Sequence, residues 1–348
     1  MNRWMAGKVG RGRTAWLVGA TAGALVLAGC GGAKVGASSD STTAAATSGG
    51  TSAAATTSVA AKKCGSVKLA DNAWVGYEAD LAVVSYLMKT KLGCTVSVKH
   101  INEQVSWQGF PTGQVDAVLE NWGHDDLVAN YITKQKTAQD AGPAGVKGII
   151  GWYVPPWMAQ KYPDITNWKN LNKYASLFKT SESGGKGQLL DGDPSYVTND
   201  QALVKNLKLN YKVVEGGSEA ALITSFRQAQ AKKTPLLAYF YQPQWFFNEV
   251  NLVKVNLPKY TKGCDAVAAK VACDYPPYLL NKIVSTKFAN SGSPAYTVIK
   301  NFKWTNEQQN IVSKYIAVNK MSDDAAAKKF FTQYPALATE WLAGTGTK

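Results

Sequence analysis

The chain has 348 residues, 45% of which are hydrophobic, and its formal net charge at pH 7 is +14. This length allows two lobes, and the apolar content supports a substantial core. A basic chain can bind nucleic acid, but the lysines are spread out rather than clustered. We therefore expect a solvated basic surface and no nucleic-acid partner.

The first 29 residues have the pattern of a signal peptide. Basic residues precede an apolar run from about Ala15 to Ala28, which is shorter than the roughly 18–20 residues that span a bilayer. The run ends in Leu27-Ala28-Gly29-Cys30, which resembles the lipobox of bacterial lipoproteins. That resemblance implies cleavage before Cys30, lipidation of its thiol, and a mature protein anchored at the extracytoplasmic face of the cell membrane. An ordinary signal peptide followed by an incidental cysteine is the alternative.

A flexible tether is predicted between this anchor and the folded part of the chain. Residues 30–63 are mostly Ala, Ser, Thr and Gly, which bury too little surface to offset the entropy lost on ordering. The folded part is therefore expected over residues 64–348, and no further apolar run in it is long enough to span a membrane.

Four cysteines lie in the folded part, and an exported protein meets an oxidising compartment. The first two open neighbouring predicted strands, and the last two close a short loop. We predict the disulfides Cys64–Cys94 and Cys264–Cys273. A zinc site is the alternative, but the chain has two histidines and no C-x-x-C motif, so no metal is expected.

Strands and helices alternate from residue 66 onward. The predicted elements are a strand at 66–70, a helix at 78–93, a strand at 95–101, a short helix within 104–115 and a strand at 116–122. This β-α-β-α-β order is typical of a parallel sheet.

A second unit of the same kind begins near residue 146. Its predicted elements are a helix at 198–207, a strand at 211–214, a helix at 218–233 and a strand at 235–241, followed by a return through 251–257 and a mostly helical tail from about 294. We expect an α/β fold of two hinged lobes, each a mostly parallel sheet flanked by helices. Lobe 1 would comprise residues 64–150 plus 250–348, and lobe 2 would comprise residues 151–249.

The loops beside the predicted strand ends share an aromatic chemistry. They carry Trp74, Trp122, Trp152, Tyr196 and Tyr241. Ligands in open α/β sheets bind beyond the carboxyl ends of the strands, so these rings are expected near one cleft. Several aromatic faces suit a base or a sugar. They also suit a quaternary ammonium ion, which has no N–H to donate and is held by a cage of rings.

Five segments carry a resemblance to a known family: "ENWGHDD", "GWYVPPWMAQKYPDITNWKNLN", "GDPSY", "VVEGGSEAALITSFRQAQ" and "YFYQPQWFF". With these segments in this order, the chain resembles the substrate-binding proteins of ABC importers for glycine betaine and related quaternary amines, over about residues 65–345. The resemblance implies a two-lobed type II periplasmic-binding-protein fold that closes at a hinge. It also implies no catalysis, no cofactor, and a monomer that delivers a small quaternary amine to an ABC permease in the cytoplasmic membrane.

The resemblance places the cage on three residues. They are Trp122 after a strand, Tyr196 in the Gly/Asx-Pro loop and Tyr241 at the start of the W-x-P-x-W segment. Relatives often carry tryptophan where this chain has the two tyrosines, so we expect a cage of altered dimensions. His124 and the backbone N–H groups after Tyr196, beginning with Val197, are expected to hold the carboxylate of the ligand.

The segment around Tyr241 adds further candidates. Strand alternation puts Tyr239 and Tyr241 on one face and Phe240 on the other, so Tyr241 should face the cleft and Phe240 the core. Trp245 in this segment and Trp74 near the first strand complete the ligand-binding candidates.

The identity of the ligand stays open at this point. Glycine betaine needs an anion-binding corner, formed by His124, Gln244 or backbone amides, whereas choline needs none. The alternative function is an exported, lipid-anchored enzyme or an adhesion lipoprotein acting on a cell-wall or amine ligand. An enzyme should show acid–base groups converging on one pocket, and the sequence has neither G-x-S-x-G nor H-E-x-x-H.

Overall fold

The computed structural model describes residues 64–347. The predicted signal peptide, the lipidation site Cys30 and the tether lie outside the described residues and stay predictions. Within residues 64–347, no helix combines the length and the apolar character needed to cross a membrane.

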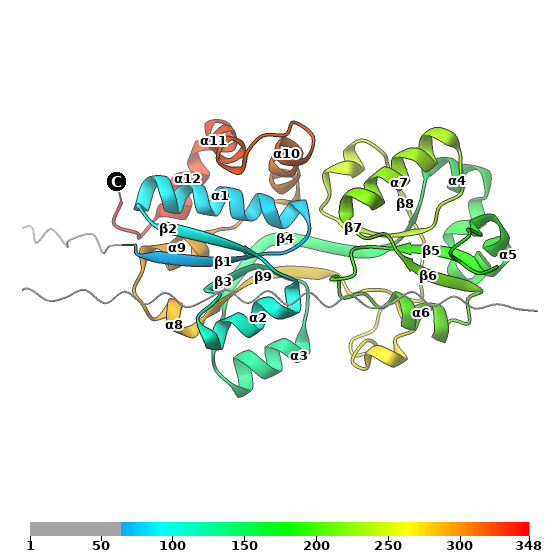
Figure 1. The fold of residues 1–348 in the computed structure, drawn as a ribbon, viewed down its shortest axis with the longest axis horizontal. Coiled ribbons are helices and arrows are strands. Elements are labelled where there is room, and N and C mark those ends of the chain that lie inside the picture. Colours follow the sequence, from blue (N-terminus) through cyan, green and yellow to red (C-terminus); the bar gives the residue numbers. More distant parts are fainter. Residues whose placement is uncertain (1–63, 348) are drawn as a thin grey trace, which may run out of the picture. The chain divides into compact units, whose positions relative to one another are not determined.

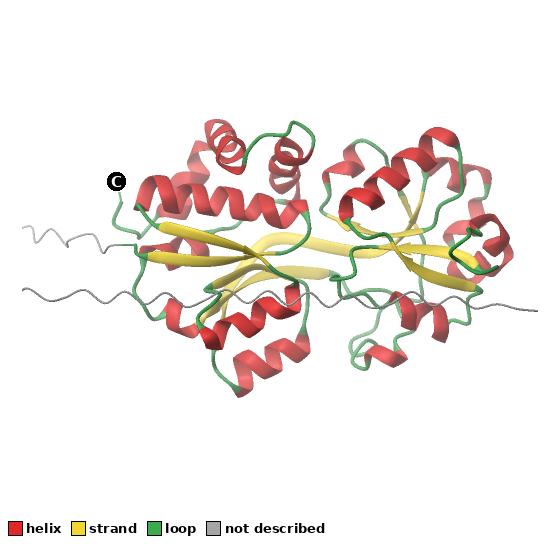
Figure 2. Ribbon diagram, viewed as in Figure 1, coloured by secondary structure: helices red, strands yellow, loops and turns green. Residues whose placement is uncertain are grey.

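One mixed sheet of nine strands runs through the described residues, in the order β2-β1-β3-β9-β4-β7-β5-β6, with β8 paired to β4 (Figure 1). Helices cover both faces of this sheet (Figure 2), which confirms the predicted α/β class. We call β2, β1, β3 and β9 the first half-sheet, and β7, β5 and β6 the second half-sheet. Strand β4 joins the two.

The first half-sheet begins with the predicted β-α-β-α-β order. Its elements are β1 (Ser66–Asp71), α1 (Val75–Leu92), β2 (Thr95–His100), α2 (Glu103–Thr112) and β3 (Ala117–Asn121). Strand β1 runs parallel to both β2 and β3. Helix α1 ends at Gly93, whose left-handed conformation (φ 65°) suits glycine.

The second half-sheet repeats this arrangement. Its elements are β5 (Gly187–Asp191), α6 (Asp200–Asn206), β6 (Tyr211–Glu215), α7 (Glu219–Lys232) and β7 (Ala238–Gln242). Strand β5 runs parallel to β6 and β7. Parallel strands joined by helices put the carboxyl ends of β5 and β7 at the same edge, as they do for β1 and β3.

The middle of the sheet is antiparallel, which the sequence did not predict. Strand β4 (Ala138–Val154) pairs with β9 (Tyr278–Ser285) as far as Gly148 and with β7 from Ile149 onward. One continuous strand of 17 residues therefore passes from the first half-sheet into the second. Strand β9 was missed because Lys282 interrupts its apolar pattern. That lysine is fully buried, and its Nζ donates to the carbonyl oxygens of Lys300 (3.0 Å) and Phe302.

The C-terminal region is helical, as predicted. It contains α9 (Pro294–Asn301), α10 (Asn306–Ala317), α11 (Asp323–Gln333) and α12 (Pro335–Leu342), and the first three pack against α1 (Figure 1). Trp304 and Trp341 are both buried, and each packs edge-to-face on Phe302.

Two disulfides tie down loops at the surface. Cys64 pairs with Cys94 between the starts of β1 and β2, and Cys264 pairs with Cys273 in the return segment. The remaining short elements are α3 (Asp125–Leu127), a π-helix (Val128–Lys134), α4 (Pro156–Lys161), α5 (Leu171–Tyr174), β8 (Val253–Lys254), α8 (Thr286–Ala289) and 3₁₀ turns at Pro163–Thr166, Trp168–Asn170, Ala175–Phe178, Trp245–Asn248 and Ala268–Lys270.

Candidate functional site

A cavity lies where the two half-sheets meet, beyond the carboxyl ends of their parallel strands. Aromatic side chains dominate its wall. The lining residues are Trp74, Glu103, Trp122, His124, Ile150, Tyr196, Val197, Tyr239, Tyr241 and Tyr278. This is the position at which α/β folds of this kind hold ligands.

Each principal ring is carried by a different strand end. Trp74 is the residue before α1, shortly after β1, and Trp122 directly follows β3. Tyr196 stands in the loop between β5 and α6, and Tyr241 lies on β7. The first two rings thus come from the first half-sheet and the last two from the second.

These four rings form a closed circuit, which we call the aromatic box. The centroids of Trp74 and Trp122 are 6.4 Å apart with an interplanar angle of 88°, and those of Trp122 and Tyr241 are 5.9 Å apart at 79°. The circuit continues from Tyr241 to Tyr196 (6.2 Å, 86°) and from Tyr196 back to Trp74 (5.8 Å, 79°). Neighbouring walls are therefore nearly perpendicular.

The dimensions of the aromatic box suit a small cation. Perpendicular walls with these centroid separations place the centre of a square box about 4.3 Å from each ring, inside the roughly 6 Å reach of a cation–π interaction. The volume of the cavity is about 40 Å³. By the same measure, a cavity that holds one water molecule needs about 10–15 Å³. This volume favours a compact group over a long chain.

Two glycines, one on β4 and one directly after β5, let two of the rings lie close to the backbone. A Cβ atom added at Gly148 on β4 would come within 2.5 Å of Trp122 Cζ3, and one added at Gly192 would come within 2.5 Å of Tyr196 Cδ2. Any larger residue at either position would displace a wall of the box.

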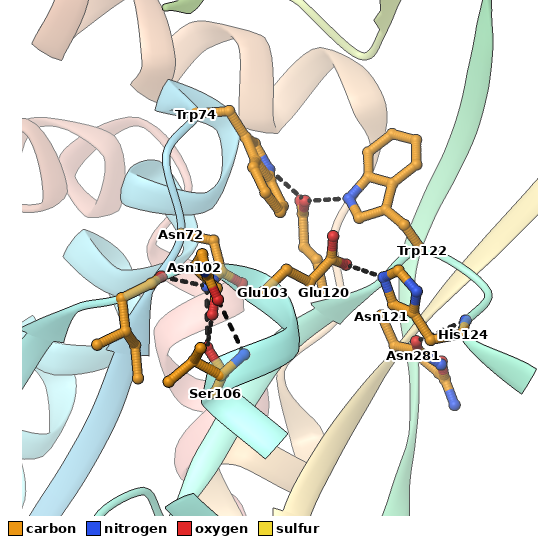
Figure 3. Close-up of polar contacts among 12 residues, drawn as sticks. Asn72, Trp74, Asn102, Glu103, Ser106, Glu120, Asn121, Trp122, His124 and Asn281 are labelled. Atoms are coloured by element: carbon orange, nitrogen blue, oxygen red, sulfur yellow. Dashed lines mark hydrogen bonds and ion pairs between the residues drawn. The ribbon is translucent and has the colours of Figure 1, made fainter. Parts of the chain in front are cut away.

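Carboxylates lie behind three of the four walls. Glu120 Oε2 accepts hydrogen bonds from Nε1 of Trp74 (2.7 Å) and Nε1 of Trp122 (3.0 Å), as Figure 3 shows. Glu219 accepts one from the hydroxyl of Tyr241. Both carboxylates are buried, and neither lines the cavity.

An ion pair forms the polar part of the cavity wall. His124 Nε2 lies 2.7 Å from Glu103 Oε1, and both side chains are buried (Figure 3). Burial alone would lower the pKa of His124, but the hydrogen bond and charge of Glu103, helped by Asp126 and Asp125, outweigh it and raise this pKa above its ordinary value. These neighbours therefore stabilise the imidazolium form relative to that of a free histidine.

Hydrogen bonds beside the box connect the two halves directly. The Tyr196 hydroxyl donates to the carbonyl oxygen of Ala73 (2.8 Å), and the backbone N–H of Val75 donates to Glu219 Oε2 (3.1 Å). Glu219 also accepts from Gln244 Nε2 (2.9 Å), so this glutamine is engaged outside the cavity.

The structure brings most of the predicted site residues together. Six of the seven ligand-binding candidates line the cavity: Trp74, Trp122, His124, Tyr196, Val197 and Tyr241. The prediction for Trp245 is not supported, because its ring is buried in the turn after β7, edge-to-face on Phe246, outside the cavity lining.

Four lining residues were not among the sequence candidates: Glu103, Ile150, Tyr239 and Tyr278. Tyr239 could have been included, since strand alternation puts it on the same face as Tyr241. Tyr278 begins the strand that was missed. Glu103 opens α2 after the N-cap residue Asn102, where an acidic residue is ordinary and carries no sign of a site.

The fold and the aromatic box define a solute-binding protein of the two-lobed periplasmic type. Residues 65–333 match the family described as the substrate binding domain of the ABC-type glycine betaine transport system, and the chain belongs to this family. It is a substrate-binding protein of the quaternary-amine class of ABC importers.

Individual relatives are distant in sequence. A trimethylamine N-oxide-binding protein of Pelagibacter ubique (strain HTCC1062) is 24% identical over 266 residues, which cover 70% of this chain and 81% of the relative. An ABC-transporter choline-binding protein in complex with choline superposes with a TM-score of 0.68 at 17% identity, covering 82% of this chain and 94% of that one. Lactococcal OpuAC in its closed form with glycine betaine gives 0.61 at 21%, covering 80% and 99%. At these identities the solved structures establish the fold.

Proposed function

We propose that this chain is the extracytoplasmic receptor of an ABC importer and that the aromatic box holds the trimethylammonium group of glycine betaine or a related compact amine. The observation that carries the proposal is the closed circuit of four near-perpendicular rings, two from each half-sheet.

The box matches the chemistry of a fully alkylated nitrogen. Such a cation has a permanent charge and no N–H, so it gains nothing from hydrogen-bond acceptors and much from ring faces. Each desolvated cation–π contact contributes about 2 kcal/mol, so three or four contacts suffice for micromolar affinity. Protonated amines would lose hydrogen bonds to water on entering the same space.

The polar wall supports a ligand with an oxygen at its other end. His124 in its imidazolium form and the backbone N–H of Val197 are the donors that we assign to a carboxylate or another anionic oxygen. The carboxylate of Glu103 balances the charge of the His124 imidazolium and fixes the orientation of its ring. The carboxylate of the ligand would therefore meet a hydrogen-bond donor in a part of the cavity wall that carries no net positive charge.

Delivery to a permease follows from closure of two lobes. We assign lobe 1 to residues 64–150 plus 250–348 and lobe 2 to residues 151–249, with β4 as one of the connections. Ligand in the box would join walls from both lobes and favour a closed shape that the permease recognises. Lipidation at Cys30 and the tether would hold this monomeric receptor near the permease.

Isothermal titration of the purified chain tests the proposal with glycine betaine, proline betaine, choline, carnitine and trimethylamine N-oxide. We expect micromolar binding of at least one of the compact ligands. Trp122→Ala should weaken it by about 2 kcal/mol or more, whereas Trp168→Ala, at a half-buried tryptophan outside the box, should not. Absence of any quaternary-amine binding below about millimolar concentrations would refute the proposal, and turnover of a tested amine would favour the enzyme alternative.

A further inference from the structure

Glu120 lies directly behind two walls of the aromatic box. It stands on β3, is 1% exposed, and receives both indole N–H groups through one oxygen, Oε2. Its other oxygen, Oε1, accepts from Gln309 Nε2 on α10. No part of Glu120 lines the cavity, so it can act on a ligand only through Trp74 and Trp122.

A second buried acid lies beside Glu120 and bears on which of the two side chains carries the negative charge. Asp80 on α1 is fully buried beside Glu120, and Gln309 Nε2 donates to its Oδ1 at 3.0 Å. Burial raises the pKa of both acids: that of Asp80 lies well above its usual range, where the charge of Glu120 adds to the effect, and that of Glu120 is also raised, although hydrogen bonds from the two indoles, Gln309 and Asp80 act to lower it. Three N–H groups converge on Glu120, from Trp74, Trp122 and Gln309, so we assign the negative charge of the pair to Glu120 and a proton to Asp80.

An anion in this position changes what the ring faces offer. An indole that donates to a carboxylate gains electron density in its ring, and the charge behind it adds a direct attraction for a cation in front. The low dielectric of the surrounding core keeps both effects strong. A carboxylate exposed in the cavity would also attract water and protonated amines, because it offers a hydrogen-bond acceptor. Behind the rings it supplies charge alone.

We propose that Glu120 is a specificity-determining residue of the aromatic box, a buried counter-charge that favours fully alkylated cations without touching them. The inference deepens the function proposed above and rests on it. Tyr241 repeats the arrangement on the opposite side of the box, since its hydroxyl donates to the buried carboxylate of Glu219.

The test compares glycine betaine with its carbon isostere 3,3-dimethylbutanoate, which has the same shape and a neutral quaternary carbon in place of nitrogen. Betaine binding is measured by titration, and isostere binding by competition against betaine. In Glu120→Gln, which keeps an oxygen acceptor for the indoles, we expect betaine affinity to fall about tenfold and isostere affinity not to fall. Glu120→Asp, which keeps the charge, should restore most of the preference for betaine.

Asp200→Asn is the matched control. Asp200 is also fully buried and accepts an indole N–H, from Trp152 (2.8 Å), together with the hydroxyl of Tyr275 (2.6 Å), but Trp152 does not line the cavity. Its substitution should leave the betaine-to-isostere ratio unchanged. An equal loss for both ligands in Glu120→Gln, or no loss, would overturn the inference. Absence of betaine binding by the wild-type chain would instead refute the function itself.

A wild-type measurement guards against a Gln variant that does not fold. With ¹⁵N-labelled tryptophan, the indole N–H signals of Trp74 and Trp122, assigned with Trp74→Phe and Trp122→Phe, should lie downfield of those of tryptophans that donate to no carboxylate and should move on addition of glycine betaine. The signal of Trp152, which donates to Asp200 away from the box, should also lie downfield but should not move. Indole signals that have ordinary chemical shifts and do not move on addition of glycine betaine would contradict the inference.

Discussion

His124 and Glu103 bring an ion pair to the wall of a cavity that is otherwise mostly aromatic. The two side chains are buried with His124 Nε2 2.7 Å from Glu103 Oε1. Because the folded-state pKa of His124 lies above its ordinary value of 6.5, the pair stabilises the fold fully below about pH 6.5. This contribution is lost as the pH rises through the raised pKa.

We predict that His124→Gln lowers the free energy of unfolding by about 2 kcal/mol below pH 6, because it removes the buried ion pair with Glu103. The difference between wild type and variant should shrink as the pH rises, because the wild-type histidine loses its proton. Urea denaturation of both proteins between pH 5 and 9 measures it. A difference that grows toward alkaline pH would show that the histidine is neutral in the folded state.

At the scale of single residues, the sequence predicted the aromatic walls and missed what lies behind them. Trp122, Tyr196 and Tyr241 follow or end strands in loops with Gly or Pro, a pattern that favours a binding edge. Glu120 sits one residue from the end of an apolar strand, and Glu103 starts a helix. Neither position distinguishes a site residue from an ordinary one, since only tertiary contacts bring their carboxylates to the box.

Strand β4 shapes the box through a residue without a side chain. Gly148 lies against the ring of Trp122, and its backbone does not need a positive φ. Alanine would therefore be acceptable to the backbone at this position but not to the ring, because the new methyl group would overlap Trp122.

We predict that Gly148→Ala weakens glycine betaine binding by about tenfold while the melting temperature changes by only a few degrees, as expected for one strained contact. Titration and thermal denaturation provide the two measurements. Gly151→Ala on the same strand is the control, since its methyl group would meet the flexible end of Lys254 rather than a wall of the box. Unchanged affinity in Gly148→Ala would mean that Trp122 can move without cost.

At the scale of elements, the spacing of apolar residues predicted the alternating strands and helices. It did not predict the antiparallel strands in the middle of the sheet. Helix α1 and strands β1, β2 and β3 lie close to their predicted ranges because their apolar patterns are regular. Strand β9 carries a buried lysine whose partners are carbonyl groups distant in sequence, so its pattern is that of a polar segment. The length of β4 was hidden by its four glycines, one of which, Gly148, lies against the box.

For the whole molecule, the aromatic box is complete only while the two halves are in contact. Tyr196 supplies a wall from one half and a hydrogen bond to Ala73 in the other, at 2.8 Å. Its hydroxyl thus stabilises the closed arrangement independently of its ring.

We predict that Tyr196→Phe keeps the ring in place but increases the dissociation rate of glycine betaine about fivefold, which corresponds to about 1 kcal/mol for one hydrogen bond. Stopped-flow tryptophan fluorescence measures this rate. Tyr211→Phe removes a hydroxyl bond of the same length, to Leu171 within the second half, and should leave the rate unchanged. Equal rates in wild type and Tyr196→Phe would show that the bond to Ala73 does not contribute to closure.

Strand β4 changes its pairing partner between Gly148 and Ile149, and the ring of Trp122 rests on Gly148. Because a bend at this point would break no ladder on either side, we infer that the two half-sheets pivot here. The pivot and one wall of the box therefore coincide. A small rotation about this point would tilt the indole of Trp122, so we expect the opening of the lobes to dismantle the aromatic box directly, without a separate gate.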